Sequence, residues 1–427
     1  MNQHFVHEKR IEITTLSNGL TVATERMPAI ATATLGVWVG TGSRHEQAHE
    51  HGLSHLIEHM AFKGTARRSA RQIAEDIENV GGDINAATSV EYTSYTARVL
   101  GENMDVALDV LGDILINSAF DPGELAREKG VILQEYAAVE DTPDDLIYDA
   151  FMETAFTGQA VGRPILGTPD TIRSFDEATI RAFLAREYTP GKMVLAAAGD
   201  VDHARIVDMA ERLFGGMPAT APRQPEPGRY SGGERRISRK LEQANLVLGL
   251  PGLSFKDPGY YAVHLFAHML GGGLTSRLWH EVRETRGLAY SIDSFHWPFS
   301  DCGLFGIGAG TAGSDVRELM DVTLACMVQA TRDISEVELI RAKAQMKVAL
   351  LTALETPGGR IERVARQLLS WGRVVASEEI VRKVDLLEVD HVREAGRRLL
   401  EGAPTLAAIG PIKGLPSLGD IASGLKG

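Results

Sequence analysis

The sequence carries two copies of one pattern, and this duplication limits the folds open to the chain more than any other feature. The segment His55–Met60, with the letters HLIEHM, recurs 209 positions later as His264–Met269, with the letters HLFAHM. Three more pairs follow in the same order at displacements of 211 to 214 positions: Glu124–Lys129 and Glu338–Lys343, Thr142-Pro143 and Thr356-Pro357, and Leu195–Gly199 and Leu406–Gly410. Four ordered matches at nearly constant displacement indicate that one domain was duplicated.

The boundary between the copies is predicted in a segment rich in proline and glycine. Four prolines and five glycines fall between positions 214 and 234, a composition typical of linkers. A chain of 427 residues is long enough for two or three domains with cores of their own. We therefore expect a first domain at 1–213, a linker at 214–234 and a homologous second domain at 235–427.

Strand and helix patterns alternate within each copy. Asn18-Gly19 inside Ile11–Val22 is a hairpin signal. Apolar runs predict strands at Thr32–Val39, Met193–Ala198, Ala244–Leu250 and Thr405–Ile409. Helical spacing predicts helices at Leu53–Phe62, Ala70–Val80, Met104–Ile116 and Pro122–Glu140, the last with Asp121 as its N-cap. The expected fold is α+β, with two duplicated α/β sandwich domains in which helices pack on a mainly antiparallel sheet.

Composition excludes several classes of protein. The formal net charge of −13 argues against a nucleic-acid partner. Cys302 and Cys326 cannot form a metal cluster by themselves, and no apolar run reaches the length of a membrane span. Met1–Glu12 has neither an apolar signal core nor an Arg-rich amphipathic leader. We expect a cytoplasmic protein, or one from a matrix-like compartment whose leader is missing.

His55, Glu58 and His59 form the motif H-x-x-E-H on a predicted helix. Residues at i and i+4 share a helix face, so the two imidazoles can bind one cation, and Glu58 at i+3 points to the same side. Two imidazoles and a carboxylate suit zinc with an open position for water. Glu58 can then act as general base toward that water. The arrangement is the inverzincin motif, and without a third ligand it describes only two surface histidines beside a glutamate.

The chain resembles the pitrilysin/insulinase peptidases, most closely the branch of the mitochondrial processing peptidase and its bacterial relatives. The resemblance spans almost the whole chain, from Leu16–Leu20 to Leu406–Ala408. It places a third zinc ligand 76 positions after the second histidine, which is Glu135, and a supporting acid at Glu128. It implies one zinc per chain, a catalytic domain at 1–213, and a non-catalytic domain at 235–427 that faces it as a clamshell and closes over the site.

The second copy lacks these chemical groups. Its counterparts of Glu58, Glu128 and Glu135 are Ala267, Ala342 and Ala349, which leaves the pair His264/His268 without a base or a third ligand. The resemblance assigns two other residues of this copy, Arg283 and Tyr290, to the active site, where a guanidinium and a phenol can bind the substrate carbonyl and its oxyanion. Without the resemblance, Arg283 and Tyr290 would be interpreted as part of an exposed amphipathic helix.

Substrate contacts follow from the resemblance alone. Phe62 falls where processing peptidases form the pocket for the residue after the cut. The predicted edge strand Asp83–Val90, with Asn85 and Ala86, matches the strand on which substrates lie, and such edges bind extended peptides through main-chain hydrogen bonds. Asp145 and Asp149 match two acids that hold a substrate arginine. Phe62 and the two acids also have a plain structural interpretation, which is core packing for Phe62 and an ordinary surface position for Asp145 and Asp149.

The leading hypothesis is a zinc endopeptidase that cleaves extended or unfolded peptides in an enclosed chamber, with arginine preferred near the cut. One alternative is a structural subunit like the core proteins of the respiratory bc1 complex, which tend to lose parts of the zinc motif. Another is the catalytic half of a heterodimeric processing peptidase. Because Arg283 and Tyr290 lie in the same chain as the zinc motif, and no long glycine-rich loop is present, we expect a homodimer.

Overall fold

The computed structural model describes residues 11–220 and 223–427. Residues 1–10 of the segment Met1–Glu12, and positions 221 and 222 of the expected linker, therefore lie outside the described residues. The chain forms two compact units, each assembled from three segments: Met1–Tyr136, Pro164–Pro225 and Ala349–Glu378 in unit 1, and Ala137–Arg163, Glu226–Val348 and Glu379–Gly427 in unit 2. Each unit thus includes one segment from the opposite half of the sequence.

Unit 1 is built on a six-stranded sheet with the strand order β1-β2-β6-β3-β5-β4. The strands are β1 Ile11–Thr15, β2 Thr21–Arg26, β3 Thr32–Val39, β4 Asp83–Thr88, β5 Thr93–Leu100 and β6 Met193–Gly199. Only the pair β2 and β6 is parallel, and the remaining neighbours are antiparallel. The predicted Asn18-Gly19 hairpin is confirmed as the turn between β1 and β2, and β4 lies at the sheet edge, as predicted.

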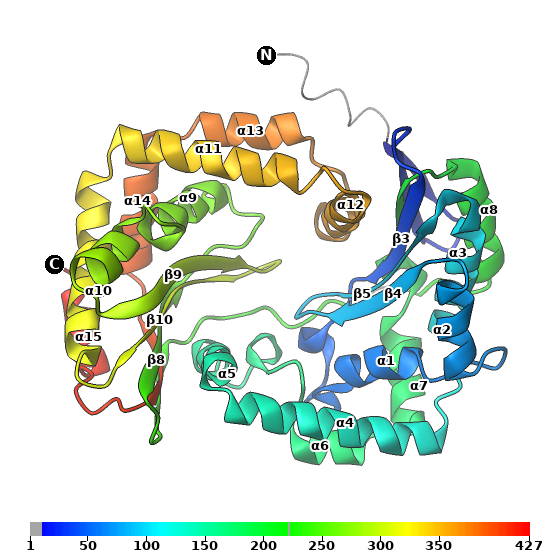
Figure 1. The fold of residues 1–427 in the computed structure, drawn as a ribbon, viewed down its shortest axis with the longest axis horizontal. Coiled ribbons are helices and arrows are strands. Elements are labelled where there is room, and N and C mark those ends of the chain that lie inside the picture. Colours follow the sequence, from blue (N-terminus) through cyan, green and yellow to red (C-terminus); the bar gives the residue numbers. More distant parts are fainter. Residues whose placement is uncertain (1–10, 221–222) are drawn as a thin grey trace. The chain divides into compact units, whose positions relative to one another are not determined.

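The helices of unit 1 cover both faces of this sheet (Figure 1). They are α1 Leu53–Ala61, α2 Ala70–Glu78, α3 Met104–Ile116, α4 Pro122–Asp141, α6 Pro169–Ser174, α7 Glu177–Glu187, α8 His203–Phe214 and α12 Pro357–Trp371. Alternate residues of a strand point to opposite faces. Val37 and Leu195 accordingly face the main core, whereas Trp38 and Val194 pack against Ile361 of α12 on the other face. The helix α12 comes from the second half of the sequence.

Unit 2 repeats this arrangement with five strands in the order β7-β11-β8-β10-β9. The strands are β7 Gly233–Ser238, β8 Gln243–Pro251, β9 Ala289–Pro298, β10 Gly303–Ala312 and β11 Thr405–Gly410. Again one pair, β7 and β11, is parallel, and the others are antiparallel. The order matches that of unit 1 without β1, so the predicted duplication and the two mainly antiparallel sheets are confirmed.

In unit 2 the helices also pack on both faces of the sheet (Figure 1). They are α5 Pro143–Ala155, α9 Tyr260–Gly271, α10 Val316–Asp333, α11 Glu336–Thr352, α13 Ser377–Asp385, α14 Val389–Leu400 and α15 Leu418–Gly424, with a π-helical turn at Trp279–Thr285. Leu246 and Leu248 of β8 face the main core. On the other face, Phe151 of α5 fills the space where a Cβ at Gly249 would stand, 2.3 Å from its ring, so only glycine fits there.

The two Thr-Pro repeats mark equivalent helices that end up in opposite units. Helix α5 follows Thr142 and packs in unit 2, and α12 follows Thr356 and packs in unit 1. The flanking helices keep a shared detail. Lys129 of α4 donates to the carbonyls that end α6, and Lys343 of α11 donates to those that end α13. The duplicated halves have therefore exchanged one helix each while keeping their own local contacts.

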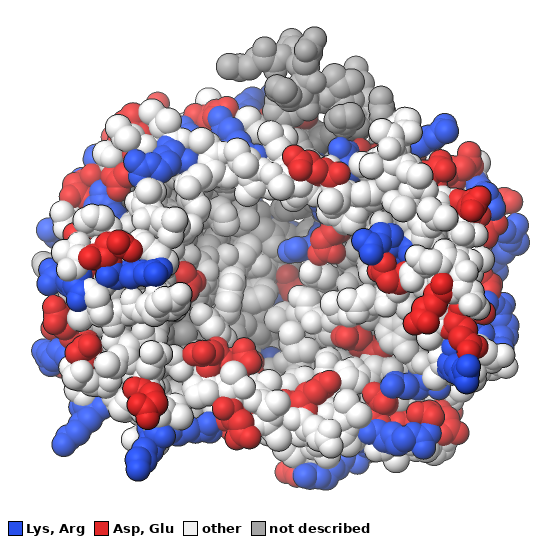
Figure 2. Space-filling model, in the orientation of Figure 1, with Lys and Arg blue, Asp and Glu red and all other residues white. Residues whose placement is uncertain are grey.

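Charged groups are spread over the surface. On the face seen in Figure 2, acidic and basic side chains are interspersed over both units. This mixing is consistent with many short-range ion pairs, such as Arg71 with Glu75 and Arg181 with Glu177 on helix surfaces. Within residues 11–220 and 223–427, none of the helices combines the length and the apolar character that crossing a membrane requires.

Candidate metal centre

Helix α1 carries the H-x-x-E-H motif, and its N-terminus is held in place on two sides. Gly52 precedes the helix with φ of +94°, and a Cβ there would lie 2.6 Å from the carbonyl oxygen of Leu166, so this turn requires glycine. The carboxylate of Glu46 accepts hydrogen bonds from the backbone N–H groups of Gly52 at 2.8 Å and Ser54 at 2.7 Å. These contacts fix where α1 begins.

Amphipathic spacing then decides which face of α1 is exposed. Leu53, Leu56, Ile57 and Met60 are buried in the core of unit 1. The intervening His55, Glu58 and His59 are only partly buried. The three polar side chains of the motif therefore share the helix face that is directed away from the core, as the spacing predicts.

Helix α4 supplies the acids. Asp121 caps it by accepting from the N–H groups of Gly123 and Glu124 at 2.8 and 3.0 Å, which confirms the predicted cap. Glu128 and Glu135 lie seven residues apart, about two turns, on one side of the helix. The Glu128 side chain is buried, and that of Glu135 is 41 % exposed.

The structure brings His55, His59 and Glu135 together. Nε2 of His55 lies 3.9 Å from Oε2 of Glu135, and Nε2 of His59 lies 3.7 Å from the same oxygen. One ligand atom from each residue falls within 4.8 Å of the others. Zinc bonds of 2.0–2.2 Å at tetrahedral angles place ligand atoms about 3.4 Å apart, so a small contraction would complete three-coordinate binding. The donor set of two imidazoles and one carboxylate fits zinc.

The environment of His55 favours the uncharged form of the ring, which is the form that binds a metal. Burial, assisted by the neighbouring His59, lowers the pKa of His55 to about 4, so its ring is neutral at physiological pH and keeps a lone pair for a metal. The two rings meet edge to face with centroids 4.6 Å apart. A neutral His55 ring at this separation carries no positive charge that would repel its neighbour.

Glu128 orients the second histidine. Its carboxylate accepts from Nδ1 of His59 at 3.0 Å, which leaves Nε2 of that ring as the atom facing Glu135. Lys63 lies 2.8 Å from the other oxygen of Glu128. Burial opposes ionisation of this carboxyl, but the hydrogen bonds from Lys63 and His59 hold the pKa of Glu128 below its usual value. A carboxylate behind a ligating histidine fixes its tautomer and increases its basicity.

Glu58 lies on the same face of α1, beside two buried phenols. The hydroxyls of Tyr95 and Tyr188 are 3.0 Å apart, and both side chains lie in the core of unit 1. Burial, with a contribution from the negative charge of Glu58, raises the pKa of Tyr188 to about 12. Both phenols therefore stay neutral at physiological pH, and the carboxyl groups of Glu58 and Glu46 are close enough to act on Tyr188 electrostatically.

The predicted substrate residues of unit 1 lie next to this helix. Thr88 of β4 donates to the carbonyl of Ser54 in α1, so the edge strand runs beside the motif. On this strand Asn85 is exposed and Ala86 is partly buried, and the side-chain oxygen of Asn85 accepts from the N–H of Ala86 at 2.9 Å. Phe62, at the C-terminal end of α1, packs against the core of unit 1.

Arg283 and Tyr290 both belong to unit 2, and the structure brings them into contact. The guanidinium of Arg283 lies 4.1 Å from the ring centroid of Trp279 and 4.8 Å from that of Tyr290. Tyr290 stands near the start of the edge strand β9 and is 79 % exposed. The cation is thus held between two aromatic faces, an arrangement that restricts its rotamers.

Asp145 and Asp149 lie one turn apart on α5 in unit 2. Asp145 is exposed and Asp149 is partly buried. Burial raises the pKa of Asp149 to about 6, and the nearby charges of Glu153, Asp145 and Glu140 add to this effect. The carboxyl group is therefore close to its titration midpoint near neutral pH, and a cationic partner would favour its charged form.

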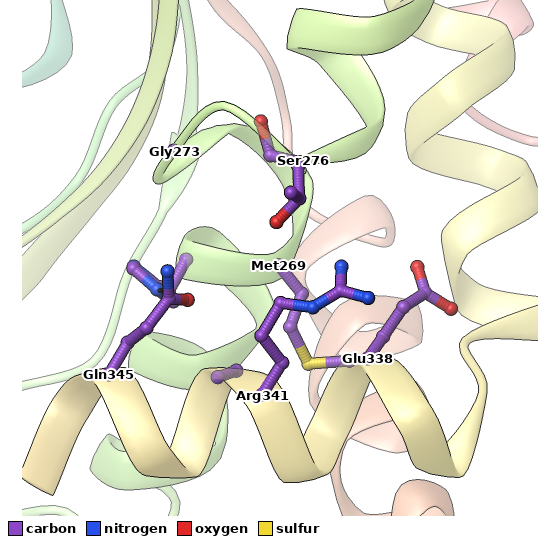
Figure 3. Close-up of a pocket in the computed structure, with 9 residues that line it drawn as sticks. Met269, Gly273, Ser276, Glu338, Arg341 and Gln345 are labelled. Atoms are coloured by element: carbon purple, nitrogen blue, oxygen red, sulfur yellow. Dashed lines mark hydrogen bonds between the residues drawn. The ribbon is translucent and has the colours of Figure 1, made fainter.

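A shallow pocket in unit 2 shows what became of the motif in the second copy (Figure 3). His268 of α9 and Gln345 of α11 line it, with Nε2 of His268 2.8 Å from Oε1 of Gln345. Ala342, the counterpart of Glu128, lies on the same wall. Arg277 beside the pocket instead pairs with Glu338 and Asp333. Nε2 of His268 therefore faces the neutral amide of Gln345, whereas Nε2 of His59 in the first copy faces the carboxylate of Glu135.

Two residues around the centre carry no signal in the sequence pattern. Lys63 follows α1 without a local motif around it, and its pairing with Glu128 depends on how α1 and α4 pack. Glu46 lies in a loop whose polar sequence is typical of exposed turns, yet it is 4 % exposed. The cap at Asp121 could be predicted, in contrast to these two residues, because capping depends on the local sequence alone.

Comparison with known proteins agrees with this geometry. The family model described as Insulinase (Peptidase family M16) matches residues 21–169, and the model described as Peptidase M16 inactive domain matches residues 174–346. An uncharacterized zinc protease of Rickettsia felis is 39 % identical over 405 residues, which cover 95 % of this chain and 98 % of that protein. An uncharacterized zinc protease of Bacillus subtilis is 36 % identical over 412 residues, which cover 94 % of this chain and 99 % of that protein.

Solved structures share the fold over nearly the whole chain. A chain of Complex III2 from Candida albicans is 25 % identical with a TM-score of 0.87, and the match covers 97 % of this chain and 99 % of that one. A protease from Helicobacter pylori has a TM-score of 0.88 at 21 % identity, and the match covers 94 % of this chain and 99 % of that one. At this identity the likeness shows the fold alone. By its family matches and its relatives along the full length, the chain belongs to the insulinase family of peptidases, family M16.

Proposed function

We propose that this protein is a zinc endopeptidase that binds one zinc per chain through His55, His59 and Glu135. The observation that carries the proposal is the convergence of these three ligand atoms within 4.8 Å, from two separate helices, beside a glutamate on the same helix face. Bound zinc supplies the Lewis acidity that activates water and polarises a peptide carbonyl. The relatives named as zinc proteases support the choice of metal.

The roles of the protein's own residues follow from their positions. Glu58 takes the proton from the attacking water and returns it to the leaving amine, as a general base and then acid. Glu128 keeps His59 in the tautomer that presents Nε2. Arg283 and Tyr290 bind the carbonyl oxygen and the negative charge that develops on it. Their mutual contact supports a joint role.

For the substrate we propose an extended peptide added to the free edge of β4. An edge strand offers unpaired backbone groups, so binding depends little on sequence. The side chain of Asn85, which accepts from the N–H of Ala86, would move aside to release that donor. Phe62 contacts the residue after the cut, and Asp145 and Asp149 bind an arginine before it through charge-assisted hydrogen bonds.

The retained zinc motif argues against a non-catalytic subunit. The chain keeps both histidines, Glu58 and Glu135, whereas its own second copy shows what loss of the motif looks like, with three alanines in place of the acids. We further propose that two identical chains associate, since the residues of both repeats that the chemistry needs are present in one chain. A catalytic half of a heterodimer would need a second, different chain for turnover.

Cleavage-site profiling on a peptide library tests this function. Metal-free protein, zinc-loaded protein and Glu58→Gln are compared on the same library. We expect cleavage only by the zinc-loaded wild type, at internal bonds, with a higher kcat/KM for peptides carrying arginine two residues before the cut than for their lysine or alanine counterparts. No cleavage by the purified zinc-loaded chain would contradict an autonomous peptidase.

The arginine preference has its own control. The double variant Asp145→Asn and Asp149→Asn should narrow the gap between arginine and lysine peptides while zinc content stays the same. Higher salt should also weaken the preference, because these partly hydrated carboxylates are screened. A preference that persists in the double variant would exclude these two acids as the arginine site and leave the zinc chemistry untouched.

A further inference from the structure

The loop that leads from β3 into α1, residues 40–52, is polar in sequence, yet several of its polar and charged side chains are buried in the structure. Thr41, Ser43, Arg44, Glu46 and Glu50 are each less than 5 % exposed. Buried charged groups are costly unless paired or hydrogen-bonded, so their partners reveal what each one does. This loop adjoins the helix that carries the proposed metal ligands.

Glu46 caps α1 from a distance. An N-cap side chain normally satisfies the free N–H groups of the first helical turn, but the N-cap residue here is Gly52, which has no side chain. Glu46 supplies the missing acceptor from six residues upstream. One carboxylate oxygen accepts from Gly52 at 2.8 Å and the other from Ser54 at 2.7 Å, and all three residues are buried.

The hydrogen bonds from Gly52 and Ser54 to Glu46 lie next to the proposed metal ligands. Ser54 directly precedes His55, and His59 follows one turn later on the same face. Helix α1 has only nine residues, so its direction depends strongly on how its ends are held. A negative carboxylate at the N-terminus also interacts favourably with the helix dipole. A tilt of α1 would move both imidazoles relative to Glu135 on α4.

We propose that Glu46 is a positioning residue of the metal centre, whose buried carboxylate fixes the N-terminus of α1 and so preorganises His55 and His59 for binding zinc together with Glu135. The inference rests on the ligand set proposed above. Glu46 does not touch the metal or the substrate in this account. Its loss should weaken zinc binding by more than the general loss of stability explains.

Glu50 provides a matched control in the same loop. Its carboxylate is also buried, at 3 % exposure, and it accepts two hydrogen bonds from Arg186 at 2.9 and 2.7 Å and one from the N–H of Gln47 at 2.8 Å. These partners lie outside α1. Glu50→Gln therefore removes an equally buried negative charge from the loop without cutting the bonds to Gly52 and Ser54.

The experiment compares zinc affinity with stability in the full-length chain. Metal-free wild type, Glu46→Gln, Glu46→Ala and Glu50→Gln compete for zinc with a chromophoric chelator, and the urea midpoint of each is measured without metal. Glu46→Gln keeps the shape but its amide nitrogen cannot accept, so one of the two bonds is lost. We expect zinc dissociation constants about tenfold higher for Glu46→Gln and higher still for Glu46→Ala. Glu50→Gln should stay within about threefold of wild type, even with an equal or larger fall in urea midpoint.

Amide hydrogen exchange supplies a second readout that needs no metal. In Glu46→Gln the segment 53–61 should exchange faster than in wild type, while α3 and α4 keep their protection. Unchanged zinc affinity in both Glu46 variants, or an equal loss in Glu50→Gln, would overturn the proposal. A wild-type chain that bound no zinc would contradict the ligand set instead, and the exchange data would still decide whether Glu46 holds α1.

Discussion

Nδ1 of His59 donates to the carboxylate of Glu128 at 3.0 Å, across the contact between α1 and α4. This bond leaves Nε2 as the only nitrogen of the ring with a free lone pair, and Nε2 is the atom that faces Glu135. Lys63 keeps Glu128 ionised by binding its other oxygen. The orientation of one proposed ligand is therefore set by residues that do not themselves bind the metal.

Removing Glu128 should weaken zinc binding without abolishing it. In Glu128→Ala the His59 ring loses its acceptor and can rotate or change tautomer, and we expect zinc affinity to fall about 10–100-fold. Glu124→Ala is the control, because Glu124 lies on the same helix and pairs with Arg127 at the surface. Chelator competition measures both variants. Equal affinities for Glu128→Ala and wild type would rule out this supporting role.

Glu58→Gln should keep fold and zinc but lose turnover. The amide preserves the shape of the side chain but cannot take a proton from water, and a positioned general base commonly contributes about 10²–10⁴-fold to the rate. The measurement is kcat on a cleaved peptide, with zinc content determined on the same sample. Near-normal kcat in this variant would exclude Glu58 as the base.

The exchange of α5 and α12 predicts that neither half of the sequence is stable alone. A fragment of residues 1–220 lacks α12 and would expose the sheet face of Trp38 and Val194. We expect it to be poorly soluble, and co-expression with residues 221–427 to rescue it. In the full chain, Ile361→Ala should cost about 2–5 kcal/mol in the free energy of unfolding, because Ile361 is 2 % exposed on that face. A soluble 1–220 fragment that unfolds cooperatively would contradict this account of α12.

Asp149 should destabilise the protein at neutral pH. Its carboxyl group has a pKa of about 6 in the folded chain, above the value of 3.8 for a free side chain. The folded state thus binds its proton more tightly, and stability falls as pH rises from about 4 to 6 and stays lower above this range. Asp149→Asn should raise the unfolding free energy by about 1–2 kcal/mol at pH 7.5 and by nearly nothing at pH 4. Urea titrations at both pH values, with exposed Asp144→Asn as control, measure this difference. A gain of equal size at pH 4 would contradict the raised pKa.

Local sequence signals predicted most of the architecture. Helix α3 and strand β3 begin and end at the predicted residues, and the ends of α1, α2, α4 and the other predicted strands shift by one or two positions. The hairpin at Asn18-Gly19 and the cap at Asp121 depend on neighbouring residues only, which is why pattern alone finds them. The histidines of the motif could be found in the same way, whereas Glu135 was identified only through a family resemblance, because one acid on a helix has no local signature.

What the sequence did not reveal depends on packing between distant segments. The Thr-Pro repeats at Thr142 and Thr356 indicate equivalent helices, but no local pattern shows that each helix packs in the opposite unit. Glu46 was missed for a related reason. Its loop is rich in charged and small residues, which is typical of exposed turns, and its burial follows from the ion pairs and backbone contacts around it.

Zinc content per chain tests the central claim most directly. Wild type, Glu135→Ala and His264→Ala are purified under the same conditions, dialysed against zinc-free buffer and analysed for bound metal. The account predicts about one zinc per chain in wild type and in His264→Ala, and a loss of most of it in Glu135→Ala, because the second copy of the motif lacks its acids. Equal zinc in wild type and Glu135→Ala, or loss of zinc in His264→Ala, would contradict it.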